Sequence, residues 1–592
     1  MLNHNGEEDM SFDTVWFSKG NLDDSGYIIE IAIPFKSLRF PYKKEFIIGL
    51  GVRRSIGRKS ETVTLPEYDP HKGSRLSQRQ MIAVSDINYD RLFEIIPALT
   101  LKQGSSYVGR EWQESVRLND FSLTGKIGIT PEFILDVTYN PDFSQVESDA
   151  GQIDINLRYA LFYAEKRPFF LEGQDYFAFA CTEPGNASFM MPFKNVVNTR
   201  SIVDPLIGLK LIGKVGDNNR LLTLFALDEY PKKMSEADGK NFEKNAVISI
   251  FRYKRGLYKD SYFGGFYTWR QLSGSSNRLI GSDGRFRLTG KSKIEYYAFA
   301  SFSHDVKTKT QRLGSAFALE YSYLSRKINL NIGFHEISKD FRTDIGYIIR
   351  TGISKIPLTL EYTVYPDSKF FQRIKLVHMS RFSIDKYSNL FETVNWLGFE
   401  IHMPRQGMMW MGFYPGHNEI YANQRFQKYK FAMGVSGQIF KQVYFDFNTI
   451  RGKKVYYDLE KPFQGKGSTA WLNLIFQPSR KLNIGVRFTY DSFYRDSDDE
   501  KIYDYTIIRN KTTYQLNRYL FFRGIVEYNS YHERINADFL ASFTYIPGTV
   551  IQAGYGSIYE KMWRDGQEYF PVDDYIQIYK AFFFKASYLW RF

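Results

Sequence analysis

Apolar and polar residues alternate along most of the chain from about Phe133 to its end. The alternation is clear in FILDVTYN at 133–140, in KLNIGVRFTYD at 481–491, and on both sides of Pro547-Gly548. A repeat of two residues indicates β-strands with one apolar and one polar face, and Pro-Gly between two such runs is typical of a tight hairpin turn. The pattern therefore predicts a long series of antiparallel strands with very little helix.

The predicted strands are about ten residues long, which matches the length that crosses a lipid bilayer at a tilt. Tight turns alternate with longer polar connections at 229–245, 451–468 and 491–501, an alternation typical of outer-membrane barrels. Allowing roughly 25 residues for each strand with its connection, we expect about 16–20 strands, with an even number usual for one bacterial chain. The predicted fold class is all-β: a large antiparallel transmembrane β-barrel with both termini on the periplasmic side.

Aromatic residues make up 17% of the chain, with 51 Phe and 43 Tyr. A soluble core does not need so many tyrosines, whereas membrane barrels place rings of aromatic side chains at both lipid–water interfaces. No run of the sequence approaches the ~18 consecutive apolar residues of a membrane-spanning helix. A barrel lacks such a run because every second residue faces its lumen, so the composition favours a membrane barrel.

One run of Met and aromatic residues, MMWMGFY at 408–414, falls where we expect a loop. It folds back into the barrel mouth, sits at the lipid interface or lines a ligand site. The sequence leaves these three alternatives open.

The formal net charge is +13, from 78 Lys and Arg against 65 Asp and Glu. Both signs are spread along the whole chain, so the basic stripe of a nucleic-acid-binding protein is missing and we expect no nucleic-acid partner. The single cysteine, Cys181, and eight histidines without metal-ligand spacing predict no metal and no cofactor. The first residues, MLNHNGEEDMSF, contain neither a basic nor an apolar signal region, so we expect the signal peptide to be absent from this chain.

The last twelve residues, AFFFKASYLWRF, form the clearest single strand pattern. Aromatic side chains occupy one face, and the chain ends on Phe592. This ending resembles the recognition signal of Gram-negative outer-membrane proteins, which implies that Tyr588, Trp590 and Phe592 are read by the outer-membrane assembly machinery. The alternative, a terminal strand of a soluble sandwich, requires a second buried layer that the sequence does not supply.

A dense block of charge at 140–173 interrupts the alternation. Its candidate residues are Asn140, Pro141, Asp142, Phe143, Gln145, Glu147, Asp149, Glu165, Lys166, Arg167, Pro168, Phe169, Phe170, Glu172 and Gly173. Proline cannot donate a ladder hydrogen bond, and a wet lumen tolerates charges that lipid does not. We therefore expect 140–175 to form a plug-like segment in the lumen or across its periplasmic mouth, as a brace or as a gate. The two phenylalanines would wedge it in place, and its charged residues would pair with charges on the strands.

Four stretches carry a family resemblance. DSGYIIEIAIPFKSLRF at 24–40 resembles the closing half of a carbohydrate-binding family 9-like sandwich. The stretches YNPDFSQVESDAGQID at 139–154, FYAEKRPFFLEG at 162–173 and HEISKDFRTDIGYIIRTG at 335–352 resemble the bacterial outer-membrane barrel domain of unknown function that follows such a module. The resemblance implies a partial, N-terminally shortened sandwich at 1–95 and a barrel at 96–592.

Within that sandwich, Trp16 is the candidate for stacking on a sugar, with core packing as the alternative because aromatic side chains are mostly buried. The resemblance implies a protein of the cell outer membrane that transports or binds glycan-related material, with outer-membrane lipid, glycans and the assembly machinery as partners. An enzyme is the less favoured expectation, since no nucleophile or acid/base pair stands out. The alternatives are a barrel-associated hydrolase acting on carbohydrate or lipid, and a structural protein of envelope assembly.

Overall fold

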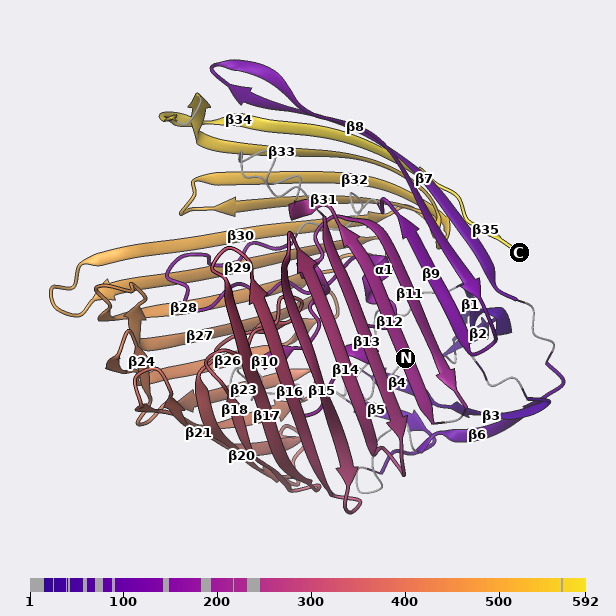
Figure 1. Cartoon of the computed structure of the whole chain (residues 1–592), viewed down its shortest axis with the longest axis horizontal. Helices are drawn as coiled ribbons and strands as arrows, with labels where there is room; N and C mark the ends of the chain where they lie inside the picture. Colours follow the sequence, from indigo (N-terminus) through magenta and orange to yellow (C-terminus); the bar gives the residue numbers. More distant parts are fainter. Residues whose placement is uncertain are drawn as a thin grey trace.

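The computed structural model describes residues 15–24, 26–38, 40, 43–56, 61–69, 78–87, 91–141, 149–182, 193–216, 218–231, 245–565 and 568–592. Within these residues, a closed antiparallel barrel of 24 strands forms the wall (Figure 1). The all-β barrel predicted from the sequence is confirmed. No helix among the described residues is long and apolar enough to cross a bilayer.

The wall strands follow one another around the ring in chain order. They are β7 (Phe93–Val108), β8 (Glu111–Gly128), β9 (Phe133–Tyr139), β11 (Pro205–Val215), β12 (Asn219–Asp228), β13 (Ala246–Gly256), β14 (Tyr262–Leu272), β15 (Ser275–Arg287), β16 (Ser292–Asp305), β17 (Thr310–Leu324), β18 (Ile328–Ile337), β20 (Ile353–Val364), β21 (Arg373–Asp385), β22 (Leu390–Met403), β23 (Gly407–Phe413), β26 (Lys430–Phe440), β27 (Val443–Tyr456), β28 (Phe463–Phe476), β29 (Leu482–Arg495), β30 (Lys501–Gln515), β31 (Leu520–Asn529), β32 (Arg534–Ile546), β33 (Thr549–Asp565) and β34 (Glu568–Ser587), which β35 (Trp590–Arg591) continues.

The strand number differs from the expected 16–20. Many connections are very short, such as Ser273-Gly274 between β14 and β15 and Lys441-Gln442 between β26 and β27. Each strand with its connection therefore takes fewer residues than the roughly 25 that the sequence estimate allowed. The run at 408–414 is a further correction, because most of it lies in wall strand β23 between β22 and β26 and not in a loop.

The wall is inside-out compared with a soluble protein. On β34, Phe582 and Phe584 are 60% and 42% exposed, whereas Lys585 is only 4% exposed. On β20, Ile356 is 46% exposed beside Lys355 at 2%. Charged side chains are almost never fully buried in soluble proteins without a partner, so the apolar side chains form the outer face and the charged ones point into the lumen.

The ring closes where its last strands meet its first. Phe584 of β34 pairs with Leu101 of β7, and Trp590 of β35 pairs with Ile95. Tyr588, Trp590 and Phe592 are 54%, 49% and 68% exposed on the outer face. This pairing leaves no open edge between the two ends of the sheet.

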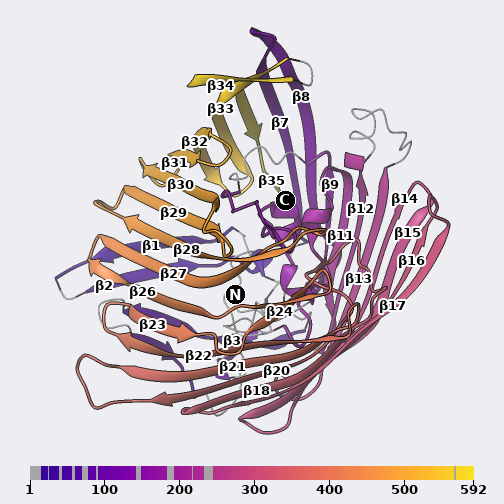
Figure 2. The same cartoon turned by 90° about the vertical axis from the view of Figure 1, so that its left-hand side faces the viewer.

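The chain between β9 and β11, residues 140–204, leaves the wall, and we call it the luminal segment. Its described elements are α1 (Pro168–Leu171), η5 (Gln174–Phe177), β10 (Phe193–Asn195) and η7 (Thr199–Ser201). Figure 2 looks into the ring of strands and shows this purple stretch within it. Strand β10 pairs with β19 (Tyr347–Ile348), which belongs to the connection 338–352, the inward loop.

The two ends of the barrel carry different features. β7 starts and β35 ends at one of them, the terminal end, and because neighbours are antiparallel, β9 runs away from it. The luminal segment, the inward loop and a hairpin at 414–429, with β24 (Asn418–Tyr421) and β25 (Gln424–Gln427), all leave the wall at the opposite end. The luminal segment thus enters the lumen from the end opposite the termini.

The main apolar core lies inside the barrel. It joins Phe170, Phe193 and Ile202 of the luminal segment to inner-face residues of β11–β18 such as Leu222 and Ile248. All five side chains are at most 1% exposed. This side of the lumen is therefore packed and dry, which differs from the wet lumen that the sequence led us to expect.

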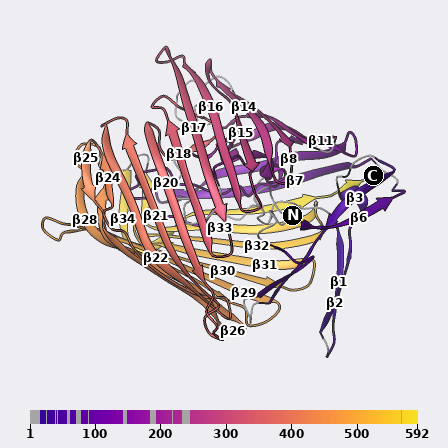
Figure 3. The same ribbon diagram turned by 90° about the horizontal axis from the view of Figure 1, so that it is seen from below.

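Among the described residues before the barrel, six short strands form three two-stranded sheets at the terminal end, β1–β2, β3–β6 and β4–β5 (Figures 1 and 3). They are β1 (Phe17–Leu22), β2 (Tyr27–Ala32), β3 (Glu45–Leu50), β4 (Val52–Ile56), β5 (Glu61–Leu65) and β6 (Gln80–Ser85), with η1 (Phe35–Ser37) after β2. Many of their apolar side chains are exposed, including Ile28 at 59% and Ile47 at 67%. The sandwich at 1–95 stays a prediction, and Trp16 is 51% exposed.

Candidate functional site

The luminal segment holds most of the candidate residues from the sequence. Asp142, Phe143, Gln145 and Glu147 lie outside the described residues. Asn140 ends β9 with a positive φ of 44°, and its backbone N–H still donates to the carbonyl of Leu206 at 2.7 Å. The chain turns into the lumen only after that bond.

Residues 165–182 and 193–204 form the apolar half of the segment. Pro168 starts α1, and Phe169 and Phe170 are buried in the main core. The aromatic wedge expected from the sequence therefore has the contacts that such a role requires.

A buried ion pair supports this apolar half from within. Arg167 donates through Nε and Nη2 to the two carboxylate oxygens of Glu165 at 2.8 and 2.7 Å, and Nη2 also donates to the carbonyl of Thr199 at 2.6 Å. Burial disfavours the charged form of Glu165, but the hydrogen bonds and charge of Arg167 and the Thr199 hydroxyl outweigh it and hold the pKa of Glu165 below its usual range. The pair is internal to the segment, not a bridge to the wall.

Among the ion pairs between described residues, one of the four predicted charges reaches a wall strand. Glu172 accepts from Lys126 Nζ of β8 at 2.7 Å. Lys166 pairs instead with Asp149 of the same segment at 3.0 Å. The expectation that all four charged residues pair with strands is wrong, because the segment turns back on itself and brings its own charges together.

Residues 149–164 form the polar half, which crosses the lumen without helix or strand. Gly151 donates its N–H to Glu527 of β31 at 3.0 Å, and Asp154 accepts from Tyr505 of β30 at 2.9 Å. Further along, the Asn156 amide donates to the Val455 carbonyl of β27 at 3.0 Å. The polar half is therefore held by hydrogen bonds and ion pairs, and its Ile153 and Ile155 pack against a second, smaller apolar cluster of Phe493, Tyr503, Tyr505 and Ile507.

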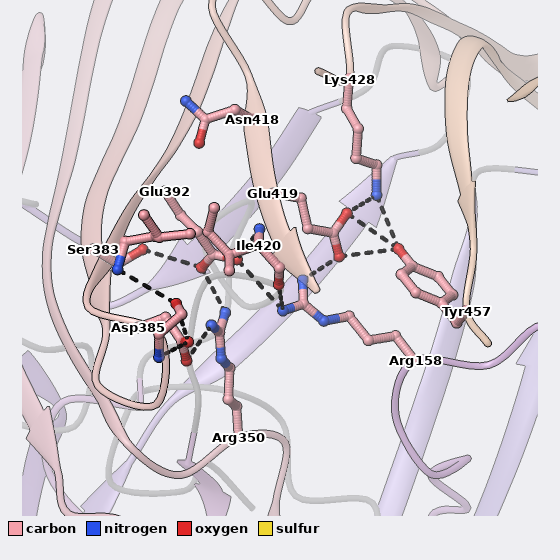
Figure 4. Close-up of polar contacts among 12 residues, drawn as sticks. Arg158, Arg350, Ser383, Asp385, Glu392, Asn418, Glu419, Ile420, Lys428 and Tyr457 are labelled. Atoms are coloured by element: carbon pink, nitrogen blue, oxygen red, sulfur yellow. Dashed lines mark hydrogen bonds and ion pairs between the residues drawn. The ribbon is translucent and has the colours of Figure 1, made fainter. Parts of the chain in front are cut away.

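The polar half ends in a cluster that we call the Arg158 junction (Figure 4). It consists of Arg158, Arg350, Glu392, Glu419, Lys428 and Tyr457. Arg158 pairs with Glu419 of β24, reaches Glu392 of β22 at 3.4 Å and donates to the Ile420 carbonyl at 2.8 Å. The junction thus joins the luminal segment, the wall and the 414–429 hairpin, while Arg350 brings in the inward loop.

Burial makes the charges of the junction strongly interdependent. It acts against the ionised form of Glu419, but Lys428 and Arg158 outweigh it and hold the pKa of Glu419 well below its usual range. Burial and the nearby Lys428 and Lys430 lower the pKa of His417 to about 3. At neutral pH, Glu419 is therefore a carboxylate and His417 is uncharged.

A cavity of about 300 Å³ adjoins the junction. Arg158 and Tyr159 line it from the polar half, Arg350 from the inward loop, Arg381 from β21, and His417 from the hairpin region. Among the described residues, no group of three His, Cys, Asp or Glu side chains is placed to hold a metal ion. The polar groups that converge on this cavity suit a small polar ligand.

The sequence did not identify the junction. Arg158 lies within the predicted segment 140–175 but is not among its candidate residues, and the structure has neither helix nor strand at 156–164. Its partner Glu392 lies 234 residues away on an ordinary alternating strand. One signal was available: the stretches 162–173 and 335–352, both singled out by resemblance, meet in the lumen, where the rings of Phe162 and Tyr347 have their centroids 5.1 Å apart.

Comparison with known proteins gives one family match. Residues 105–180 match a domain of unknown function, DUF5916. The match runs from the second half of β7 into the luminal segment and leaves residues before 105 unassigned. No curated protein matches the chain.

Solved structures with a similar shape include siderophore receptors and a copper transporter, all at low similarity. The siderophore receptor PirA from Pseudomonas aeruginosa has a TM-score of 0.43 and 8% identity, with 86% of this chain and 82% of that chain covered. The siderophore receptor PiuA from Acinetobacter baumannii has a TM-score of 0.39 and 7% identity, with 86% and 83% covered. The copper transporter OprC has a TM-score of 0.40 and 9% identity, with 86% and 83% covered. A similarity this low says nothing about the ligand or the mechanism of this chain.

Proposed function

We propose that this protein is an outer-membrane barrel that moves small solutes through a lumen closed by its luminal segment. The inside-out wall supports the membrane placement. Each square ångström of its apolar outer face that leaves water for lipid contributes roughly 25 cal/mol, and the closed ring leaves no unpaired strand edge in the hydrocarbon. Outer-membrane lipid and the assembly machinery are the partners that this placement implies.

The observation that carries the transport proposal is the division of the luminal segment into two halves. The apolar half is built into the main core through Phe170 and Phe193. The polar half is held mainly by polar contacts such as those of Arg158, Asn156 and Gly151. Water or a polar solute that enters the lumen can take over such contacts, whereas the apolar half cannot leave the core without exposing apolar surface to water. We infer that the polar half is the gate and the apolar half its fixed support.

Conductance across planar bilayers tests this division. Arg158→Gln removes the ion pairs to Glu392 and Glu419, and we expect it to raise the open probability or single-channel conductance at least threefold. The matched control is Arg287→Gln, which removes an equally buried ion pair, to Asp260, at the terminal end of β15. Unchanged conductance in Arg158→Gln, with the folded form verified by its heat-shifted gel mobility, would mean that the polar half only braces the wall.

The glycan part of the proposal rests on the resemblance of residues 24–40 and on the exposed face of Trp16. An exposed indole is available to stack on a sugar ring. Trp16→Ala should abolish any retention of the purified protein on immobilised oligosaccharide. Retention that is equal in Trp16→Ala and wild type would remove Trp16 as the contact.

The hydrolase alternative is less favoured by the junction. Glycoside hydrolysis needs a protonated carboxylic acid beside a carboxylate. Glu419 is the one carboxylate among the described residues that line the cavity, and Lys428 and Arg158 keep it ionised. It is therefore poorly suited to donate a proton.

A further inference from the structure

The cavity at the Arg158 junction is lined by far more positive than negative charge. Its described lining includes six basic side chains, Arg158, Arg350, Lys355, Arg381, Lys428 and Lys430. Glu419 is the single carboxylate among the described lining residues. This imbalance is local, because carboxylates and basic residues are nearly matched along the chain as a whole.

Part of this positive charge is already compensated. Arg158 pairs with Glu392 and Glu419, Arg350 pairs with Asp385 and Glu392, and Lys428 pairs with Glu419. The backbone N–H of Ile420 donates to Glu392, and the Tyr457 hydroxyl donates to Glu419 at 3.0 Å. These acidic groups are therefore fully engaged and cannot turn to neutralise further cations.

Two basic residues of the cavity have no such compensation. No carboxylate among the described residues lies within ion-pair distance of Arg381 or Lys430. The Nε of Arg381 is buried without a hydrogen-bond partner, and so is the Nδ1 of His417 on the same cavity. A charge that is partly withdrawn from water without a counter-charge is unfavourable, so a negatively charged group in the cavity would stabilise Arg381 and Lys430.

The size and chemistry of the cavity narrow the class of ligand. About 300 Å³ is at the small end of ligand sites. The planar guanidinium of Arg381 suits an oxyanion, to which it can donate two parallel hydrogen bonds, while Lys430 supplies a point charge. Phosphate and carboxylate groups share this chemistry.

We propose that the cavity binds a small oxyanion, a phosphate or carboxylate group, with Arg381 and Lys430 as its main contacts. That this group belongs to the transported solute rests on the transport function proposed above; the binding site itself does not. The ligand would lie directly against Arg158, between the gate and the wall.

Isothermal titration of the full chain in detergent, at constant ionic strength, tests the site. The probes are inorganic phosphate and citrate, with glucose as the neutral control. We expect saturable binding of at least one anion, no binding of glucose, and a Kd at least tenfold higher in the double variant Arg381→Gln/Lys430→Gln. The matched control is Lys254→Met, which removes a buried lysine on β13 whose Nζ also has no hydrogen-bond partner but which does not line this cavity.

Each outcome has a defined meaning. Binding of phosphate alone or of citrate alone shows which oxyanion the site prefers. An unchanged Kd in Lys254→Met shows that loss of a buried lysine outside the cavity does not weaken binding. If the double variant does not fold, Arg381→Lys should retain charge but weaken binding severalfold by losing the planar fork. Absence of saturable binding, or an equal Kd in the double variant, would overturn the site. If the anion binds but Arg158→Gln does not change the conductance, the binding site is supported and the transport proposal is wrong. If Arg158→Gln raises the conductance but no anion binds, the transport proposal is supported and the binding site is wrong.

Discussion

Glu165 and Arg167 are two positions apart in sequence and buried together, with 8% and 5% of their surfaces exposed. Their side chains connect residues 165–167 to Thr199 and Ile202, at η7 and directly after it. A buried ion pair does not always stabilise a fold more than a pair of apolar side chains of similar size would. Removal of one partner, however, strongly destabilises the fold, because the other charge stays buried alone. At the residue scale, this pair decides whether the apolar half keeps its shape.

Glu165→Ala should therefore destabilise the apolar half by about 3–5 kcal/mol, because Arg167 stays buried without its carboxylate. Hydrogen exchange of peptides covering 165–182 measures this directly. The matched control is Lys166→Ala, since the Lys166–Asp149 pair is about a third exposed and such pairs contribute at most about 1 kcal/mol. Equal protection in Glu165→Ala and wild type would contradict the role of the pair.

The same pair predicts a pH dependence. The pKa of Glu165 is lower in the folded than in the unfolded chain, so its contribution to stability is present above the ordinary glutamate value of about 4.3 and is lost as pH falls through the folded-state value. Exchange protection of the apolar half should be constant between pH 8 and 5 and decrease below about pH 4. Protection that falls between pH 7 and 5 would assign the effect to another group.

At the scale of elements, a short helix fixes where the luminal segment turns. Pro168 begins α1 at a position where its missing N–H costs no bond, and Gly173 follows the helix with a φ of +80°. A Cβ on Gly173 would lie 2.4 Å from Ile212 Cδ1 of β11. The glycine therefore serves both the left-handed turn and the close approach of the segment to the wall.

Gly173→Ala should lower the thermal midpoint at which the folded form loses its heat-shifted mobility. The left-handed φ costs about 1 kcal/mol in alanine, and overpacking against Ile212 adds roughly 1–3 kcal/mol. Gly216→Ala separates the two terms, because Gly216 has a φ of +62° but nothing within 4 Å of its added Cβ. If both variants shift the midpoint equally, the contact with Ile212 is not the cause.

At the scale of the whole molecule, the barrel depends on its closing seam. β35 and the end of β34 pair with β7, and Arg591 Nε lies 3.0 Å from Glu94 Oε1 across the seam. Without this pairing, β7 would present unpaired backbone groups to lipid, which costs several kcal/mol per group. The exposed aromatic faces of Tyr588, Trp590 and Phe592 lie outside the seam and remain available for recognition.

Two variants separate closure from recognition. Deletion of 579–592 should prevent the heat-shifted form both in cells and after refolding in detergent, since the pairing of β34 and β35 with β7 is lost. Substitution of Tyr588, Trp590 and Phe592 together by Ala keeps the backbone pairing, so we expect refolding in detergent but at least tenfold less folded protein in the outer membrane. Normal levels of the triple variant in cells would remove the assembly signal from these residues.

The local features of the sequence predicted much of the fold and part of the site. Alternation around Phe582 and Lys585 indicated which side faces outward, because a strand has a period of two whatever its neighbours are. The prolines and charges of 140–173 predicted a segment outside the wall, and the buried Phe169 and Phe170 agree with a wedge. The strand number was too low, since turn length is set by a few residues and small errors accumulate around the ring.

What the sequence by itself determined is therefore local: the strands, their two faces, the closing aromatic strand and the departure of the luminal segment. Only the tertiary structure decided that Arg158 meets Glu392 and Glu419, that Arg381 and Lys430 remain without carboxylates, and that the lumen is dry on one side. The physical reason is geometric. Which side chains face each other across a barrel depends on the number and stagger of all its strands, and no local pattern carries that information.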